Sequence, residues 1–316
     1  MKPSRHTIAV DGPLDLPLTL SCGQAFRWRP VTTAVDAAAG RPASEGATET
    51  WSGVVEGAEV RALAREGELQ VELLGRDPGR EAIVRYFRLD ENPESHLAHA
   101  PRLRAIPGFT GLLGMRLLRQ APWETLVSFI CSAASNVRKI SGGVEGMAER
   151  WGDPIAGSNR RAFPSPERLA AVREPDLRAL GIGFRAPYVL GAARRLARDP
   201  WDWDALRGAP IEEARALLQE LPGVGPKVAD CVLLFGLDRL DTYPVDRWIR
   251  RATLELTSRR SARDEDLERW SRSLGPSRGY LQQILFHLRR TGGPLPFIDG
   301  LPTVKRAPRV RRRKAS

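Results

Sequence analysis

The sequence predicts an α+β fold in which a small N-terminal domain with an antiparallel sheet precedes a larger, all-helical domain. Residues 58–74 alternate apolar and polar side chains around Glu66-Gly67, which is typical of a β-hairpin. From about residue 80 to about residue 290, apolar side chains recur three and four positions apart, as they do in amphipathic helices. The chain has 316 residues, 42% of them hydrophobic, so two or three domains that share a surface can form.

The N-terminal domain is expected over residues 1–100. Besides the hairpin, strands are predicted over residues 14–20 (LDLPLTL) and 24–30 (QAFRWRP). Between these strands and the hairpin, residues 31–50 are rich in Ala, Gly and Thr and show no hydrophobic periodicity. Such a composition cannot bury enough apolar surface to order itself, so a flexible insertion is expected there.

The helical domain is expected over residues 101–295, with glycine and proline marking the joins between its helices. Residues 296–316 are expected to form a basic, disordered tail. The helical spacing, which begins before this domain, predicts helices at residues 81–87, 123–136, 175–181, 187–199, 211–220, 226–236, 246–256, 266–274 and 280–290.

The charge balance indicates a polyanionic partner. The net charge is +11 and the pI is near 10.3. Residues 304–316 carry seven of the positive charges and no acid, which leaves +4 for the rest of the chain. Two interpretations of the tail stay open: it promotes solubility, or it makes salt-dependent phosphate contacts.

Other features of the sequence limit the expected cellular location and the expected chemistry of the protein. An apolar run long enough to cross a membrane and a secretory signal are both missing from the sequence, so a cytosolic or nucleoid-associated protein is expected. Cys22, Cys131 and Cys231 are about a hundred residues apart, which is not metal-ligand spacing. His96 and His99 have no third ligand nearby and are expected at the surface. We therefore predict no metal and no cofactor.

Residues 211–236 predict two helices joined by a tight turn, IEEARALLQE-LPGVG-PKVADCVLLFG. Gly223 and Gly225 allow positive φ and a close approach to a ligand. Pro226 suits the first position of the second helix, where no N–H is needed. Such a turn exposes backbone amides and a helix N-terminus, which together attract phosphate. Units of this kind also occur in proteins that only grip the DNA backbone, so the motif alone does not define an enzyme.

Lys227 lies in the first turn of the second predicted helix and has two interpretations. A surface ion pair with Asp230, three residues later, would contribute only a few tenths of a kcal/mol. Alternatively, the helix dipole and nearby arginines favour a neutral, nucleophilic amine, which faces along an apolar wall that includes Cys231. Asp246, nineteen residues later in TYPVDRWIRR, suits the N-cap of the helix that follows. A capping carboxylate is fixed and ionised, so the same residue can also assist the amine and stabilise a cationic sugar.

These segments resemble a known family. LPGVGPKVADCVLLF…YPVD is similar to the helix-hairpin-helix and Gly/Pro…Asp motif of base-excision DNA glycosylases in its lysine-bearing, bifunctional form. LSCGQAFRWRP, WSGVV, RYFRLD, LLRQAPWETLVSFICSAASN, LGIGFRAPYV and GYLQQILF resemble segments of 8-oxoguanine DNA glycosylases. The likeness runs in order from about residue 14 to residue 290.

The resemblance implies roles at the reacting base. Lys227 matches the nucleophile that forms a Schiff base, and Asp246 matches the aspartate that assists it. Gly23 matches the glycine whose carbonyl accepts the N7–H that distinguishes 8-oxoguanine from guanine. At the same pocket, Gln282 matches the contact to the Watson–Crick edge, and Cys231 and Phe286 match the residues that sandwich the flipped base. From the residues alone, Phe286 is equally explained by core packing and Gln282 by a surface amide.

At the DNA surface the resemblance implies which positions contact DNA, and this sequence differs from the family at two of them. The asparagine that reads the opposite cytosine falls on Ala134, and one of the two arginines falls on Lys139, while Arg185 is retained. Asn136 either fills the gap left by the flipped base or only caps a helix. Gly223 and Gly225 match the phosphate-binding hairpin. Arg247 adds a backbone contact or belongs to a solvated helix face. A weakened preference for cytosine opposite the lesion is expected.

The resemblance thus implies a monomeric DNA glycosylase and AP lyase that excises 8-oxoguanine from damaged double-stranded DNA. An alternative on the same scaffold is a glycosylase for alkylated or mismatched bases, but its monofunctional members lack a lysine at position 227. A module that only anchors DNA would need neither Lys227 nor Asp246.

Overall fold

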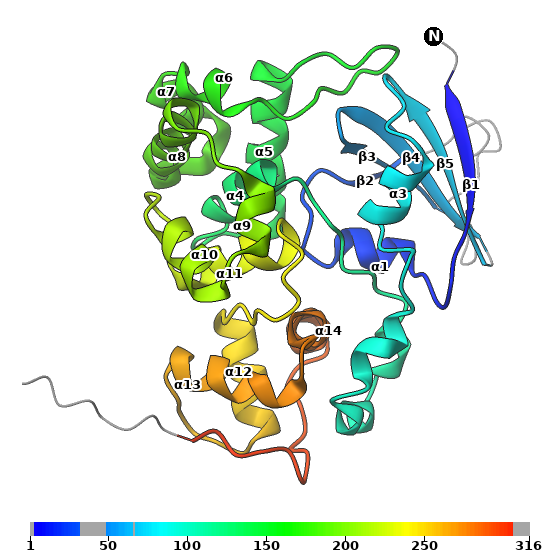
Figure 1. Cartoon of the computed structure of the whole chain (residues 1–316), viewed down its shortest axis with the longest axis vertical. Helices are drawn as coiled ribbons and strands as arrows, with labels where there is room; N and C mark the ends of the chain where they lie inside the picture. The colour runs from blue at the N-terminus through cyan, green and yellow to red at the C-terminus, as the bar shows by residue number, and fades with distance from the viewer. Residues whose placement is uncertain (1–2, 32–48, 66, 306–316) are drawn as a thin grey trace, which may run out of the picture.

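A five-stranded antiparallel sheet forms the N-terminal layer of the computed structural model, in the order β1-β5-β4-β3-β2 (Figure 1). The structure describes residues 3–31, 49–65 and 67–305. The mostly helical remainder of the described chain follows the sheet, which confirms the predicted α+β class. The strands are β1 (Ser4–Ala9), β2 (Arg29–Val31), β3 (Thr50–Val55), β4 (Ala58–Arg65) and β5 (Glu68–Leu74).

The predicted hairpin is confirmed as β4 and β5, whose register pairs Arg65 with Glu68 and Glu59 with Leu74. One face of the sheet carries the buried side chains of Val60, Val71 and Leu73 and packs on helices α1 and α3. The opposite face is polar. The predicted flexible insertion falls almost entirely on residues 32–48, which lie outside the described residues.

The predicted strand over residues 14–20 is wrong. The segment forms helix α1 (Leu16–Ser21) because Asp15 caps it, accepting the N–H of Leu18 at 2.8 Å, and Pro17 suits a first helical turn. Leu16 and Leu20 then pack under the sheet. In the predicted strand over residues 24–30, only its last two residues enter β2.

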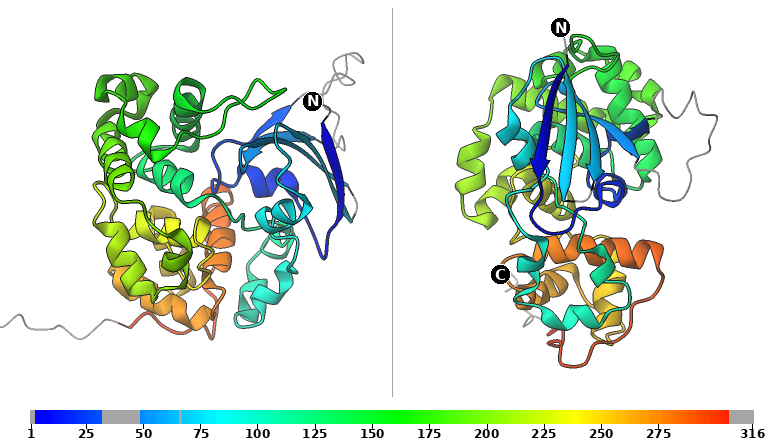
Figure 2. Two further views of the ribbon diagram at one scale, coloured as in Figure 1. Left: turned by 45° about the horizontal axis from the view of Figure 1, so that its top comes forward. Right: turned by 90° about the vertical axis from the view of Figure 1, so that its right-hand side faces the viewer.

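The helices lie beside and below the sheet, with the green segments behind it in the right-hand view of Figure 2. The α-helices are α3 (Arg80–Tyr86), α4 (Pro122–Ile130), α5 (Val137–Trp151), α6 (Pro166–Ala170), α7 (Glu174–Leu177), α8 (Ala186–Arg198), α9 (Trp203–Gly208), α10 (Ile211–Gln219), α11 (Pro226–Phe235), α12 (Arg247–Leu256), α13 (Asp264–Ser271) and α14 (Arg278–Thr291). Short turns join them: η1 (Pro93–Leu97), η2 (Pro101–Ala105), η3 (Thr110–Leu112), η4 (Arg178–Ile182), η5 (Gly183–Arg185) and η6 (Arg272–Leu274).

Helix α5 was not predicted, because glycines interrupt its helical pattern and glycine is a poor helix former. The structure gives these glycines a packing role. A Cβ at Gly143 would lie 2.5 Å from Ile182, and one at Gly146 would lie 2.8 Å from Leu180. The glycines therefore allow α5 to approach η4 closely.

Helix α11 is buried along almost its whole length. Residues 228–235 are all buried, and the helix packs against α4 and α10. Phe235 stacks on Phe129 of α4, with ring centroids 5.3 Å apart and an interplanar angle of 8°. The N-terminal turn of α11 is thereby fixed next to the C-terminal end of α4.

Buried arginines join the sheet domain to the helices. Arg88, 1% exposed, donates to the carbonyl of Leu117 at 2.9 Å and to Glu91 at 3.0 Å, and it also pairs with Asp238. Arg119 contacts Asp238 at 2.7 Å and also pairs with Glu91. These ion pairs bring the end of the sheet domain to the residues that follow α11.

His96 is buried, so the expectation that it lies at the surface is wrong, whereas His99 is exposed. The ring of His96 stacks on Tyr280 of α14 at 4.1 Å, and its Nδ1 lies 3.0 Å from Ser277 Oγ. Its Nε2 lies 3.2 Å from Glu91 Oε2. The sequence did not indicate this burial, because Ser277 and Tyr280, which pack on the ring, are far away in the sequence.

The segment after α14 packs on the helical domain. The N–H of Ile298 donates to Leu256 at 3.2 Å, and Trp270 donates to the carbonyl of Pro302 at 2.6 Å. Val304 is 1% exposed. Of the expected basic tail, residues 306–316 lie outside the described residues, whereas within residues 296–305 the side chains of Ile298 and Val304 are buried. Among the helices described, none has the length and apolar character needed to span a membrane.

The ion pairs between the domains predict an acid-sensitive contribution to stability. The contact with His96, with the charges of Arg88 and Arg119, lowers the pKa of Glu91 from 4.5 to about 2. Because the pKa is lowered on folding, this stabilisation is present above about pH 4.5 and is lost as pH falls towards 2.

We expect Glu91→Gln to lower the free energy of unfolding by about 2 kcal/mol at pH 7, with the gap closing as the pH falls from about 4.5 to 2. Urea unfolding across this range measures the gap. Glu94→Gln, at a carboxylate that is 54% exposed and pairs with Arg104, is the control and should change stability by less than about 0.5 kcal/mol. A gap for Glu91→Gln that stays constant with pH would contradict the assignment.

Candidate active site

The turn between α10 and α11 is shaped by Gly223 and Gly225 in different ways. Gly223 has a φ of +77°, and a Cβ there would lie 2.7 Å from Tyr188 of α8, so this position requires glycine. Gly225 caps α11 with a φ of −92°, so the predicted positive φ is wrong for this residue. Its surroundings are open, which leaves the backbone at the start of α11 accessible.

Lys227 projects from the first turn of α11 towards the end of α4. Its Nζ donates to Ser132 Oγ at 3.0 Å and lies 5.0 Å from the centroid of the Phe129 ring. Asp230 instead bonds Arg215 of α10 at 2.7 Å and is 5% exposed. The alternative of a surface ion pair between Lys227 and Asp230 is therefore wrong.

Cys231 is buried on α11, one helical turn after Lys227. Burial raises the pKa of its thiol to about 12, while the charge and hydrogen bonding of Lys227 lower it and the charge of Asp246 raises it. Both charged groups are thus close enough to act on the same thiol. Because the thiol stays neutral near pH 7, it offers the site an uncharged, polarizable surface rather than a second nucleophile.

Asp246 caps helix α12, as the sequence predicted. Its Oδ1 accepts the N–H groups of Trp248 and Ile249, both at 2.8 Å. Both bonds end on the same oxygen, so Oδ2 takes no part in the cap. The carboxylate is held in one place by the helix and keeps an acceptor for a ligand.

Gly23 follows α1 in the N-terminal domain, whereas Gln282 and Phe286 both lie on α14. A Cβ on Gly23, whose φ is +95°, would lie 3.8 Å from Phe286 and 3.5 Å from Val137. Gln282 is 4% exposed and donates from Nε2 to the carbonyl of Pro244 at 3.2 Å. Its Oε1 is buried and has no hydrogen-bond partner among the described residues. A buried, unpaired acceptor of this kind is costly unless a ligand supplies a donor.

Arg185 and Ala134 lie on the turn regions that flank α8 and α5. Arg185 is 8% exposed; it donates from Nε to the carbonyl of Ala133 at 2.7 Å and from Nη1 to that of Ile182 at 3.1 Å, and its Nη2 also bonds Ala133. Three of its N–H groups are thus used within the protein. Ala134 has a φ of +48°, a conformation that favours glycine or asparagine.

Two predicted DNA contacts occupy helix N-termini. Asn136 caps α5 through its Oδ1, which accepts the N–H of Lys139 at 3.0 Å, and the side chain of Lys139 is exposed. On α12, Arg247 is exposed and its guanidinium lies 4.9 Å from the Trp248 ring. Asn136 therefore caps α5, which is one of the two roles expected for it.

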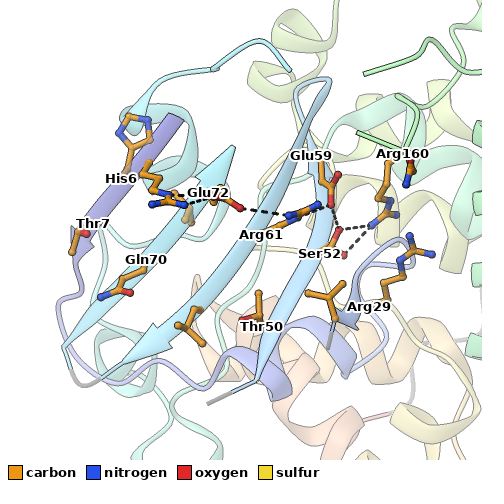
Figure 3. A pocket seen from close by; sticks show the side chains of 15 residues that line it. His6, Thr7, Arg29, Thr50, Ser52, Glu59, Arg61, Gln70, Glu72 and Arg160 are labelled. Atoms are coloured by element: carbon orange, nitrogen blue, oxygen red, sulfur yellow. Dashed lines mark hydrogen bonds and ion pairs between the residues drawn. The ribbon is translucent and has the colours of Figure 1, made fainter. Parts of the chain in front are cut away.

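A separate cavity of about 690 Å³ lies on the polar face of the sheet (Figure 3). Its charged side chains are largely paired with one another: Arg61 with Glu59 and Glu72, and Arg5 with Glu72. The residues at Lys227 and Asp246 are not part of its wall. Within the described ranges, His, Cys, Asp and Glu do not gather into a group of three or more that could hold a metal ion.

Sequence reasoning did not identify Ser132 or Phe129, which contact the lysine. Both lie in the segment LVSFICSAASN, which was predicted to be helical to residue 136, whereas α4 ends at Ile130. No local pattern indicates which side chain of the segment faces Lys227, which is 95 residues from Ser132. The missing information is the packing of α4 against α11.

Two helices joined by a glycine hairpin and followed by a capping aspartate are the arrangement of the helix-hairpin-helix class of base-excision DNA repair proteins. Residues 127–276 match the family described as "HhH-GPD superfamily base excision DNA repair protein". Residues 8–126 match the family described as "8-oxoguanine DNA glycosylase, N-terminal domain". The chain thus carries two adjoining domains of these families, an N-terminal domain of the 8-oxoguanine DNA glycosylase type and an HhH-GPD superfamily domain.

Individual relatives agree with these two domain matches. The chain is 36% identical over 203 residues to a probable N-glycosylase/DNA lyase of Methanothermobacter thermautotrophicus, covering 57% of this chain and 65% of the relative. It is 34% identical over 249 residues to the N-glycosylase/DNA lyase OGG1 of Arabidopsis thaliana, covering 74% and 63%. It thus spans less than two thirds of either relative. The solved structure of MBOgg1 in complex with a low-affinity DNA ligand has a TM-score of 0.80 and 28% identity, covering 93% of this chain and 100% of that chain.

The cap at Asp246 predicts that its structural and chemical roles can be separated. Asp246→Ala removes the acceptor for two backbone N–H groups and should lower the free energy of unfolding by about 1–2 kcal/mol. Asp246→Asn keeps an equally good cap and should stay within about 0.5 kcal/mol of the native protein. Urea unfolding measures both changes, and equal losses for the two variants would contradict the cap.

Proposed function

We propose that this protein is a bifunctional DNA glycosylase and AP lyase that excises 8-oxoguanine from damaged duplex DNA. The observation that carries the proposal is the half-buried Lys227 amine in the first turn after the glycine hairpin, whose Nζ lies 3.0 Å from the Ser132 hydroxyl. A related structure, from Clostridium acetobutylicum, is an 8-oxoguanine glycosylase/lyase bound to double-stranded DNA with cytosine opposite 8-oxoG, with a TM-score of 0.76 and 25% identity, covering 88% of this chain and 92% of that chain.

The flipped base is recognised by groups that are already in place. The carbonyl of Gly23 accepts the N7–H that 8-oxoguanine has and guanine lacks. The unpaired Oε1 of Gln282 accepts a donor from the Watson–Crick edge of the base. Phe286 and the neutral Cys231 provide the two faces of the sandwich. Unstacking the base costs a few kcal/mol, which these contacts offset.

Lys227 and Asp246 then act on the sugar. As the bond between C1′ and the base lengthens, the Asp246 carboxylate stabilises the positive charge that develops on the sugar. The neutral Lys227 amine donates its lone pair to C1′, and the base leaves with the bonding electrons and takes up a proton. Ring opening gives an imine, which acidifies the adjacent C2′ proton, and loss of that proton expels the 3′ phosphate by β-elimination.

The DNA backbone is held by the hairpin and by cationic side chains. The accessible amides around Gly223 and Gly225 bind a phosphate next to the lesion. Arg247, Lys139 and Arg185 contribute further contacts to the two strands. We also propose that one molecule acts on one lesion, as a monomer, in the cytoplasm or at the nucleoid if the source is bacterial.

Borohydride trapping tests the assigned nucleophile. Wild-type protein should form a covalent adduct with duplexes that contain one 8-oxoguanine, and Lys227→Gln should form none because the imine requires the amine. Asp246→Asn should lower the rate of base release about 10²–10³-fold because it removes the charge that stabilises the sugar cation. Asp202→Asn, at the N-cap of α9, is the matched control for an Asp that only caps a helix.

An adduct that persists in Lys227→Gln would refute the assignment of this amine. Release of alkylated but not oxidised bases would favour the alternative glycosylase. Binding of DNA without either adduct or base release would favour a DNA-anchoring module.

The opposite base should have little influence on the rate. Ala134 offers no side-chain hydrogen bond, and three N–H groups of Arg185 are used within the protein. We expect single-turnover rates opposite the four bases to agree within about threefold, since each missing bidentate contact removes about 1–3 kcal/mol of discrimination.

Ala134→Asn should raise the preference for cytosine, because asparagine tolerates the positive φ and adds an amide. Ala134→Gly is the control, because it relieves the same backbone strain without adding a donor. A strong cytosine preference in the wild-type protein would contradict this prediction.

A further inference from the structure

Ser132 connects the end of α4 to the lysine on α11. The residue lies directly after α4, in the turn that follows Cys131, and its Oγ lies 3.0 Å from Lys227 Nζ. The helices α4 and α11 pack along their lengths through Phe129 and Phe235. The separation of the hydroxyl and the amine is thereby fixed by the helix packing rather than by a flexible loop.

Towards Lys227, the hydroxyl of Ser132 can act only as a hydrogen-bond acceptor. Ser132 Oγ donates its proton to the carbonyl of Phe129 at 2.7 Å. A serine hydroxyl has one proton and two lone pairs, so it can only accept a hydrogen bond from Lys227. The Phe129 carbonyl also accepts the backbone N–H of Ser132 at 3.1 Å, so the turn does not depend on the hydroxyl.

An acceptor of this kind suits a nucleophilic amine. A neutral amine has two N–H groups and one lone pair, and one N–H bound to Ser132 limits the directions that the lone pair can take. A lysine side chain has about 2 kcal/mol of rotamer entropy to lose, and holding it in advance lowers the barrier to attack. A carboxylate in the same place would hold the ammonium form, but the nearby Asp230 is bonded to Arg215 instead.

We propose that Ser132 is a positioning residue, which holds the Lys227 amine in the direction of attack by accepting a hydrogen bond from it. This inference rests on the proposed function. The aromatic ring of Phe129 forms the floor beneath the amine, and its own orientation is fixed by stacking on Phe235 and by an edge contact with Phe26 at 5.6 Å.

The competing explanation is that the Ser132 hydroxyl only stabilises the turn. The chain offers a matched control for this role, because Ser273 Oγ makes the same bond to the carbonyl three residues earlier, to Trp270 at 2.8 Å. Ser273 lies in the η6 turn. A turn-stabilising hydroxyl affects the free energy of unfolding, whereas a positioning hydroxyl affects the rate of attack.

The experiment compares Ser132→Ala, Ser132→Thr and Ser273→Ala in the full-length protein, with single-turnover base release and borohydride trapping on an 8-oxoguanine duplex. We expect Ser132→Ala to lower both rates roughly 10- to 100-fold, with the Kd for the duplex and the urea midpoint nearly unchanged. Ser132→Thr retains the hydroxyl and should recover most of the rate. Ser273→Ala should behave as wild type.

Rates for Ser132→Ala within about threefold of wild type would overturn the proposal, since lost positioning should cost at least tenfold. Failure of Ser132→Thr to recover activity would overturn it as well, as would a loss in Ser132→Ala that follows only from weaker DNA binding or lower stability. A wild-type protein that neither releases the base nor forms an adduct would instead contradict the proposed function itself.

Discussion

The site depends on the burial of α11. Val228 to Phe235 are all enclosed, so the helix cannot rotate or slide without exposing apolar surface, at about 25 cal/mol per Å². Its first turn alone is open, and Lys227 stands there. A lysine on an exposed helix would spread over many rotamers. Here the position of its backbone is set by a core contact, the stacking of Phe129 on Phe235, and the side chain has only to reach the hydroxyl of Ser132.

The groups that we propose to react lie at helix N-termini. Lys227 lies in the first turn of α11, and Asp246 is itself the N-cap of α12. Gly225 caps α11 and leaves its first amides accessible, while Asp246 caps α12 with one oxygen and keeps the other. The cap fixes the carboxylate before any ligand arrives, so little reorganisation is needed when charge develops on the sugar. The unpaired Oε1 of Gln282 is the opposite case, since a buried acceptor without a partner costs stability in the free protein, and we propose that a bound base supplies the missing donor.

The sequence predicts those elements that are determined by residues close together in the chain. The alternation in β4 and β5 and the spacing in α11 give the correct elements, and the hairpin with its lysine and the capping Asp246 are recognisable from short stretches. The errors have specific causes. Capping by Asp15 turns a short apolar run into α1, and the glycines that conceal α5 serve its contact with Ile182. Ser132 could not be assigned, because its partner is 95 residues away.

The departure at Ala134 and the internal hydrogen bonds of the retained Arg185 change which contacts can discriminate between bases. Reading the opposite base requires donors and acceptors that are free in the unbound protein, and Arg185 has committed three of its N–H groups to the carbonyls of Ala133 and Ile182. The damaged base, in contrast, meets a buried acceptor that has no other partner. A base without the matching donor leaves Oε1 of Gln282 unsatisfied, which costs about 1–3 kcal/mol. Sites that reject ligands through unpaired buried groups are more selective than those that use apolar contacts. The selectivity that we propose therefore rests on the extruded base, with the opposite strand contributing chiefly its phosphates.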